Sequence, residues 1–295
     1  MSIENVVLAR DHRGVSALRP YLAPDFCERA ASLILQHPGT VLIVTGFYIP
    51  AGEAPETDGP PGAAALGAAL ASLGYRPVYV TDERSGVLVR GLADGAPVVE
   101  FPIDDHEASR AFAASLLAER APSLVVAVER CGLTEEGLYR NMRGDDVSAH
   151  HAKVDYLFAG GTPSVGVGDG GNEIGMGNLL PVIPLVMPMA APPCATRTTR
   201  LVIASVSNWG AWGLVAALSR LTGRSMLPTL TEARRQLERT VELGAVDGVS
   251  ARRTLTVDGF SADENERVLG EMHAWLARHG ITGRPASLPV GPPAR

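Results

Sequence analysis

The chain has 295 residues, of which 46% are hydrophobic, 20% charged and 5% aromatic, a balance typical of one large α/β domain or two small ones. Its net charge of −6 argues against a nucleic-acid-binding surface, and no apolar run reaches the length of a membrane span. The three cysteines are far apart and form no metal-binding pattern, and the N-terminus has no signal-peptide core, so we expect a cytoplasmic protein.

The first half of the chain alternates between segments with helical spacing of apolar residues and short β-branched runs. In order, these predict a helix at 24–36, a strand at 40–46, a helix at 63–74, a strand at 76–82, a helix at 83–95, a strand at 97–103, a helix at 104–121 and a strand at 123–129. The segment 47–62 between two of these elements is rich in turn residues and is expected to be a loop.

The second half continues this alternation after a polar connection at 131–146. It predicts a helix at 147–158, strands at 164–169 and 199–205, and helices at 209–223, 230–244 and 261–280. Only the C-terminal tail, 281–295, has the composition of a loose segment.

Strands that alternate with helices at this spacing predict parallel crossovers. We therefore expect a single α/β domain over 1–295, with a doubly wound, mostly parallel sheet and helices on both faces, as in a Rossmann-like three-layer sandwich. Ligands bind beyond the carboxyl ends of the strands in such sheets. The residues expected at this edge are Gly46, Asp82, Glu129, Asp169 and Asn208.

The stretch SVGVGDGGNEIGMGN, residues 164–178, carries the densest chemical signal. Its glycines permit left-handed backbone angles or a close approach to a ligand, and an acid, an amide and a second acid stand among them. This pattern is typical of a small polar site at the end of a strand. The alternative is a tight turn with no chemistry, although a turn needs fewer glycines.

Gly166, Gly168 and Gly171 also spell the G-x-G-x-x-G fingerprint of dinucleotide binding. That fingerprint requires an acid about 20 residues further on, where this chain reads VMPMAAPP. Asp169 would also meet the pyrophosphate with like charge. We therefore expect neither NAD nor FAD.

Several motifs together give a family resemblance over residues 10–280. The segments GFYI…ETDGPPGA (46–63), VTD (80–82), YRNMRGDD (139–146), VGDGGNEIGMGN (167–178) and AVDGV (245–249) resemble the D-glutamate cyclase family. The resemblance implies a carbon–oxygen lyase (hydro-lyase) that converts D-glutamate into 5-oxo-D-proline with loss of water. It implies a small-molecule substrate and no nucleic-acid or membrane partner, and it is compatible with a homo-oligomer.

This reaction needs a base for the α-amine and an acid or cation for the γ-carboxylate. Asp169, Glu173 and Asp58 are the candidate catalytic groups, and their oxygens also suit a magnesium, manganese or calcium ion. Glu173 has an alternative interpretation as a capping acid in the first turn of a helix. Asp58 has one as an Asx-turn or N-cap residue.

Substrate binding is assigned to polar and glycine residues around these acids. Arg143 is the candidate carboxylate clamp and Asn141 an amide donor, the alternatives being a surface ion pair and a turn residue. The remaining candidates offer hydroxyl, amide or backbone N–H groups, and they are Thr57, Gly59, Gly170, Gly171, Asn172 and Asn208.

Other features have structural interpretations. His150 and His151 are adjacent and cannot share a helix face, and no zinc spacing occurs. Trp209 and Trp212 are expected to pack a helix, and the repeated V-D-G at Asp247 and Asp258 is either a pair of turns or a second lip of the site.

Two further functions remain open at this stage. One is a non-catalytic protein that binds a small amino acid. The other is a phosphate- or nucleotide-handling enzyme that uses the glycine loop, although the chain lacks G-x-x-x-x-G-K-[ST].

Overall fold

The computed structural model describes residues 2–187 and 192–283. Its centre is a six-stranded sheet in the order β5-β4-β1-β6-β7-β8, in which every neighbouring pair is parallel. The strands are β1 (Thr40–Thr45), β4 (Arg76–Thr81), β5 (Val98–Glu100), β6 (Leu124–Val128), β7 (Ser164–Gly168) and β8 (Arg200–Ile203). The first strand, β1, lies in the middle of the sheet; β4 and β5 follow outward on one side, and β6, β7 and β8 follow outward on the other. The doubly wound α/β prediction is therefore confirmed.

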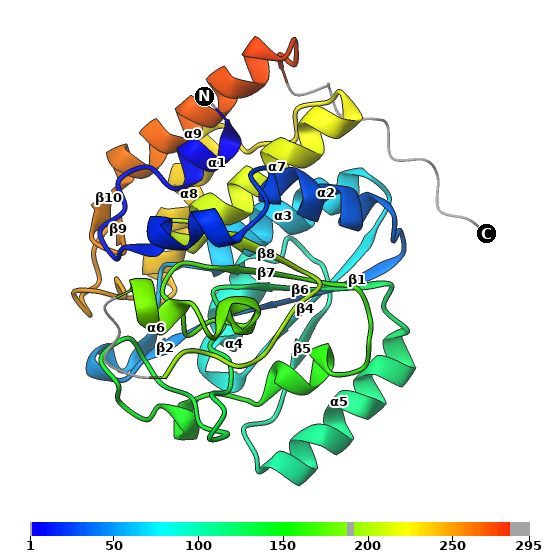
Figure 1. Ribbon diagram of the computed structural model, residues 1–295, viewed down its shortest axis with the longest axis vertical. Coiled ribbons are helices and arrows are strands. Elements are labelled where there is room, and N and C mark those ends of the chain that lie inside the picture. Colours follow the sequence, from blue (N-terminus) through cyan, green and yellow to red (C-terminus); the bar gives the residue numbers. More distant parts are fainter. Residues whose placement is uncertain (1, 188–191, 284–295) are drawn as a thin grey trace.

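Helices cover both faces of this sheet (Figure 1). The α-helices are α1 (Ile3–Val7), α2 (Phe26–Leu35), α3 (Pro60–Ser72), α4 (Glu83–Leu92), α5 (His106–Arg120), α6 (Ile183–Val186), α7 (Ser207–Thr222), α8 (Leu230–Glu242) and α9 (Ala262–Arg278). Two small antiparallel pairs lie outside the sheet, β2 (Tyr48–Ile49) with β3 (Ala54–Pro55) and β9 (Thr256–Val257) with β10 (Phe260–Ser261).

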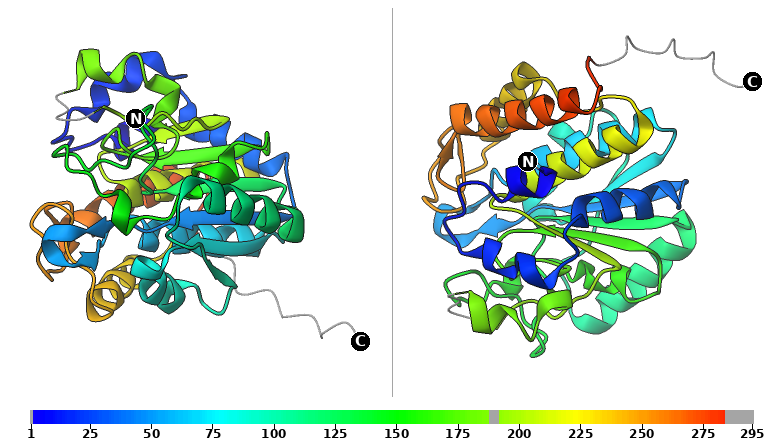
Figure 2. Two further views of the ribbon diagram at one scale, coloured as in Figure 1. Left: turned by 90° about the horizontal axis from the view of Figure 1, so that it is seen from below. Right: turned by 45° about the horizontal axis from the view of Figure 1, so that its top comes forward.

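The alternation of side chains along β1 divides the core in two. Val41 and Ile43 belong to the larger core, which α2, α3 and α7 complete, whereas Leu42 and Val44 belong to a smaller core with α5. Every residue of β1 is buried, as expected for a parallel strand that is covered on both faces. Figure 2 shows the orange-to-red helix α9 lying outside the yellow helix α7, with which it packs.

The helix expected at 147–158 is not present. The chain forms two short 3-10 helices instead, Ser148–His150 and Val154–Phe158. The reason is that the backbone of Ala152 is bound by a buried ion pair: its carbonyl accepts from Arg130 at 2.9 Å and its N–H donates to Asp82 at 3.3 Å. These bonds replace those that a continuous helix would make.

The N-terminal segment, for which the sequence pattern predicted no element, contains α1 and a 3-10 helix at Val15–Tyr21. It runs beside β9 and β10 (Figure 1), where the ring of His12 stacks on Phe260 with centroids 4.7 Å apart. Of the expected loose tail at 281–295, residues 284–295 lie outside the described residues. None of the described helices has the length and apolar character needed to cross a membrane.

Candidate active site

A cavity of about 360 Å³ opens at the carboxyl ends of the central strands. Phe47 follows β1, Glu129 follows β6 and Asp169 follows β7, and all three line the cavity. Strands β1 and β6 are the neighbours at which the winding of the sheet reverses, which is the usual ligand position in this class of fold. The cavity therefore lies where the sequence predicted the site.

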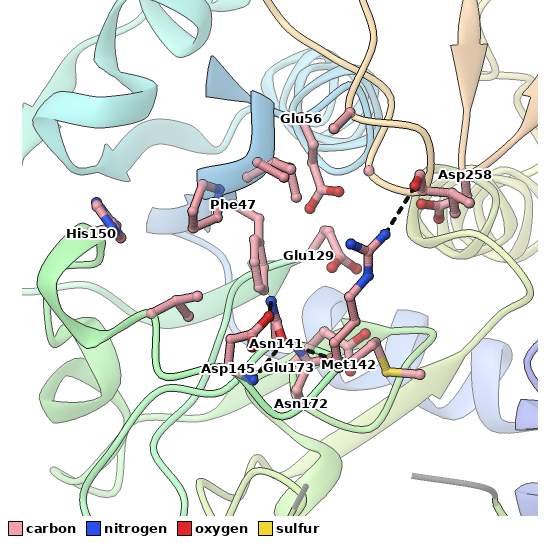
Figure 3. Close-up of a pocket in the computed structure, with 18 of the residues that line it drawn as sticks. Phe47, Glu56, Glu129, Asn141, Met142, Asp145, His150, Asn172, Glu173 and Asp258 are labelled. Atoms are coloured by element: carbon pink, nitrogen blue, oxygen red, sulfur yellow. Dashed lines mark hydrogen bonds between the residues drawn. The ribbon is translucent and has the colours of Figure 1, made fainter. Parts of the chain in front are cut away.

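Acidic side chains converge on this cavity from separate parts of the chain. Figure 3 shows Glu56, Glu129 and Asp258 around one part of it, and Asn141, Asp145 and Glu173 around another. Glu56 and Asp258 meet at Gly248, because a methyl group added there would contact Oε2 of Glu56 and lie 3.1 Å from Oδ1 of Asp258. Glycine at 248 thus lets both carboxyl groups reach the cavity.

Asp58, Glu129 and Asp169 form a compact acidic cluster beside the cavity. One oxygen of each side chain lies within 4.8 Å of the others, and at most 6% of each residue is exposed. Glu129 adopts a left-handed φ of 44°, which is uncommon outside glycine and is found preferentially at functional sites. Its N–H donates to the carbonyl of Val167 at 3.1 Å, which fixes this turn after β6.

The N-terminus of α7 holds the cluster in place. The N–H of Ser207 donates to Asp58 at 2.8 Å and to Asp169 at 3.0 Å, and the N–H of Asn208 donates to Asp58 at 2.8 Å. The hydroxyl of Ser207 donates to Glu129 at 2.6 Å. Since the amino end of a helix carries partial positive charge, α7 stabilises the ionised carboxylates.

Arg13 is a partly buried cation that faces these acids. Its guanidinium forms an ion pair with Asp169 and a second one, at 2.6 Å, with Asp258. Burial by itself would lower the pKa of Arg13, but the charges of Asp169 and Asp258 raise it well above its ordinary value. Arg13 therefore stays protonated at the wall of the cavity.

Burial is the main cause of the altered acidity of the site. It raises the pKa of Asp169 well above the usual value even though Arg13 opposes the shift. It raises the pKa of Asp58 to about 7, with a further contribution from the charge of Asp258. Burial and neighbouring carboxylates likewise raise the pKa values of Glu56 and Glu129. These acids cannot all be ionised at neutral pH without an added cation.

Glu173 lines the cavity but is not in a helix, in contrast to the position expected for it. Its carboxylate turns back and accepts the N–H groups of Asp169, Gly170 and Gly171 at 2.5 to 3.1 Å. Its backbone pairs with Cys131 in an isolated bridge. The glycine loop is thus held by hydrogen bonds to its own Glu173. The N–H groups of Gly170 and Gly171, which were expected to face a ligand, donate to Glu173 instead.

The expected substrate-binding residues divide into two groups. Asn141, Arg143 and Asn172 line the cavity, and the guanidinium of Arg143 donates to the carbonyl of Val249 at 3.3 Å. Asn141 holds its own turn by accepting the N–H groups of Arg143 and Asp145. Asn141 therefore also has the role of a turn residue, which was its alternative interpretation.

Thr57, Gly59 and Asn208 lie behind the cavity instead of lining it. The Asn208 side chain accepts the N–H groups of Gly59 and Gly62 at 3.1 and 2.7 Å and donates to the carbonyl of Thr57. The Thr57 hydroxyl donates to Thr256. These contacts fix the start of α3 and, with it, the carboxylate of Asp58.

Sequence reasoning missed Arg13 and did not select Glu56 or Asp258 as site residues. The sequence did contain an indication for Asp258, because the second V-D-G was considered as a lip of the site. Glu129 was expected at this edge as a strand-end residue. The sequence contained no indication for Arg13, because Arg13 lies in a segment without a recognisable pattern and pairs with Asp169, which is 156 residues away in the sequence.

Comparison with known proteins shows which family this chain resembles in sequence. A sequence model of the family described as D-glutamate cyclase-like, C-terminal, matches residues 3–273. The Homo sapiens protein named D-glutamate cyclase, mitochondrial, is 35% identical over 208 residues, which make up 64% of this chain and 34% of that protein. The chain thus spans about a third of the length of this curated relative. The range matched by the family includes the whole cavity and the acidic cluster.

Proposed function

This chain belongs to the D-glutamate cyclase-like family, and we propose that it interconverts D-glutamate and 5-oxo-D-proline, with loss or gain of water. The observation that carries the proposal is the family match over residues 3–273, which includes the acidic cavity at the carboxyl edge of the sheet. The enzyme would then be a hydro-lyase that acts on a small dicarboxylic amino acid.

Two guanidinium groups support binding of a substrate with two carboxylates. Arg13 lies inside the cavity and Arg143 also lines it. The described pairs of Arg13 with Asp169 and Asp258 use only part of its five N–H donors. Each guanidinium can therefore bind a carboxylate of the substrate through two hydrogen bonds.

The carboxyl groups of Glu56 and Asp258 suit the proton transfers of ring closure. A bond forms between the α-nitrogen and the γ-carbon, a carbon–oxygen bond breaks, and the two protons lost by nitrogen end on the oxygen that leaves as water. Glu56 is buried, which raises its pKa, so it is suited to donate a proton to that oxygen. Asp258, which meets Glu56 at Gly248, is placed to accept a proton from the ammonium.

The proposed location is the cytoplasm, a reducing compartment. Cys27, Cys131 and Cys194 are free and buried in the structure. Unpaired thiols of this kind are typical of proteins in reducing compartments.

Activity is tested by incubating the purified protein with D-glutamate, L-glutamate and both enantiomers of 5-oxoproline, followed by chiral chromatography. We expect turnover of the D forms and little of the L forms. Glu56→Gln should lower turnover about 10²–10⁴-fold, the usual effect of losing a general acid, because the amide cannot donate the required proton in the same way.

Glu53→Gln is the matched control, since Glu53 is an exposed acid three residues away in the same loop. It should retain the activity of the unmodified protein. Equal rates on both enantiomers, or no turnover of either at high enzyme concentration, would refute the proposed function.

A further inference from the structure

Asp58, Glu129 and Asp169 bring three carboxylates so close together that a cation fits between them, and we propose that they bind a divalent metal ion. Their oxygens lie within 4.8 Å of one another, so a central point is about 2.8 Å or less from each. Only a small contraction is needed to reach the ~2.0–2.6 Å at which oxygen ligands hold magnesium or calcium. Oxygen-only ligands favour magnesium, manganese or calcium over zinc or copper.

The charge balance favours a divalent ion over an ammonium group. When ionised, the carboxylates of Asp58, Glu129, Asp169 and Asp258 carry −4, and Arg13 contributes +1. A divalent ion reduces the remaining −3 to −1, whereas a monovalent cation reduces it only to −2. Buried charges require such compensation because the protein interior solvates them poorly.

Two buried oxygen atoms beside the cluster lack hydrogen-bond partners among the described residues, and they are an independent indication of a ligand. The Thr45 hydroxyl is fully buried, and it faces the point where Gly59 and Glu129 approach each other. Oδ2 of Asp258 is the second, on a side chain that is 4% exposed and lines the cavity. Buried polar atoms in proteins are almost always satisfied, so a hydrated ion that binds here would supply the missing partners.

The surrounding contacts are those that a metal site requires. Asp58 is oriented by the N–H groups of Ser207 and Asn208, Asp169 by Arg13, and Glu129 by the hydroxyl of Ser207. Such outer contacts fix the direction in which each carboxylate faces the ion. The sequence pattern suggested Glu173 as the third acid, but the three carboxylates that lie close together are those of Asp58, Glu129 and Asp169.

The metal site goes beyond the proposed function and does not depend on it. Its test uses binding of Mn²⁺ alone, without substrate, so a failure of the cyclase proposal would leave the result interpretable. The probe is chosen because free and bound Mn²⁺ are distinguished by electron paramagnetic resonance.

The experiment is a titration of the full chain with Mn²⁺, in the unmodified protein and in the variants Glu129→Gln and Glu56→Gln. We expect one ion per chain, and binding weakened about 100-fold or more by Glu129→Gln, since a lost ligand should have at least the effect of a lost outer contact. Glu56→Gln removes a buried acid of the same cavity that is not a ligand, and it should weaken binding less than tenfold.

Thermal melts check that both variants are folded, and Asp58→Asn replaces Glu129→Gln if the latter does not fold. The proposal is overturned if the unmodified protein binds no Mn²⁺ at millimolar concentration. It is equally overturned if the ligand variant binds as tightly as Glu56→Gln, because the ion would then lie elsewhere.

Discussion

Arg13 is the residue on which the charge balance of the cavity depends. Its position is set locally, since the carboxylate of Asp11 accepts backbone N–H groups from Arg13, Gly14, Val15 and Ser16. This turn directs the guanidinium toward Asp169 and Asp258. A single partly buried arginine thereby couples the loop after β7 to the segment between β9 and β10.

Glu173→Gln should destabilise the protein by about 2–3 kcal/mol, because hydrogen bonds to a buried charged group are stronger than neutral ones. Glu173 is 1% exposed, and its carboxylate accepts three N–H groups of the glycine loop. An amide offers one acceptor oxygen in place of two and brings its own N–H groups against these donors. Urea denaturation of both proteins measures the difference.

Glu264→Gln is the control for this prediction. Glu264 also accepts from a backbone N–H, that of Ser261, but it does so in a partly exposed capping box at the start of α9. Its replacement should cost about 1 kcal/mol or less. If Glu173→Gln had full stability but little turnover, Glu173 would take part in the chemistry and would not be needed to stabilise the glycine loop.

Helix α7 is the element that joins the core to the site. Its first residues bind the acidic cluster, and every residue from Ser207 to Ser219 is buried. Gly210 and Gly213 allow this helix to approach its neighbours, since a methyl group on Gly210 would lie 2.6 Å from Cγ1 of Val167 on β7. The close contact keeps the start of α7 at the ends of β7 and β8.

Gly210→Ala should therefore destabilise the fold by about 1–3 kcal/mol, as overpacking of a core does. Gly270→Ala is the matched control, because Gly270 lies within α9 and a methyl group there would meet no atom within 4 Å. That substitution should stabilise the protein by about 0.5–1 kcal/mol through helix propensity. Equal effects in chemical denaturation would show that the glycine in α7 is not required for packing.

The molecule as a whole is tied together beneath the cavity by buried polar groups. Arg130 pairs with Asp82 at 2.6 Å and donates to the carbonyl of Gly46, which joins the ends of β1, β4 and β6. His151 lies next to this pair, accepts the N–H of Tyr48 through Nε2, and its Nδ1 lies 3.1 Å from the carbonyl of Val147. The ring is therefore neutral, with its proton on Nδ1.

This arrangement predicts that His151 by itself destabilises the protein in mild acid. Burial lowers the pKa of His151 from 6.5 to about 4, so below pH 6.5 the unfolded chain takes up a proton that the folded chain does not. The contribution of His151 to stability should accordingly fall as the pH drops from about 6.5 to about 4, by about 2 kcal/mol between pH 7.5 and 5. The raised pKa of Asp58 acts in the opposite direction over the same range, so the His151 contribution is measured as a difference between two proteins.

Denaturation of the unmodified protein and His151→Gln across this range measures the contribution. Relative to the variant, the unmodified protein should lose about 2 kcal/mol of stability between pH 7.5 and 5. The difference between the two proteins should stay constant from pH 7.5 to 9, where the imidazole is neutral in both states. Parallel curves over the whole range would contradict the buried neutral histidine.

The sequence by itself determined the doubly wound sheet and the edge at which the polar residues gather. Both depend on local patterns, because hydrophobic periodicity defines each strand and helix, and parallel winding places Glu129 and Asp169 at the same edge. The glycine-rich stretch after β7 was identified for the same reason.

Only the tertiary structure decided which side chains face one another. It placed Arg13 against Asp169 and Asp258, and it turned Glu173 back onto its own loop. It also interrupted the helix expected at 147–158 with an ion pair between residues that follow β4 and β6. The physical reason is that each of these outcomes depends on a long-range partner or on the angles of a turn. The free energy of burying a charge depends on the partner that packing supplies, and a linear pattern of residues does not contain that information.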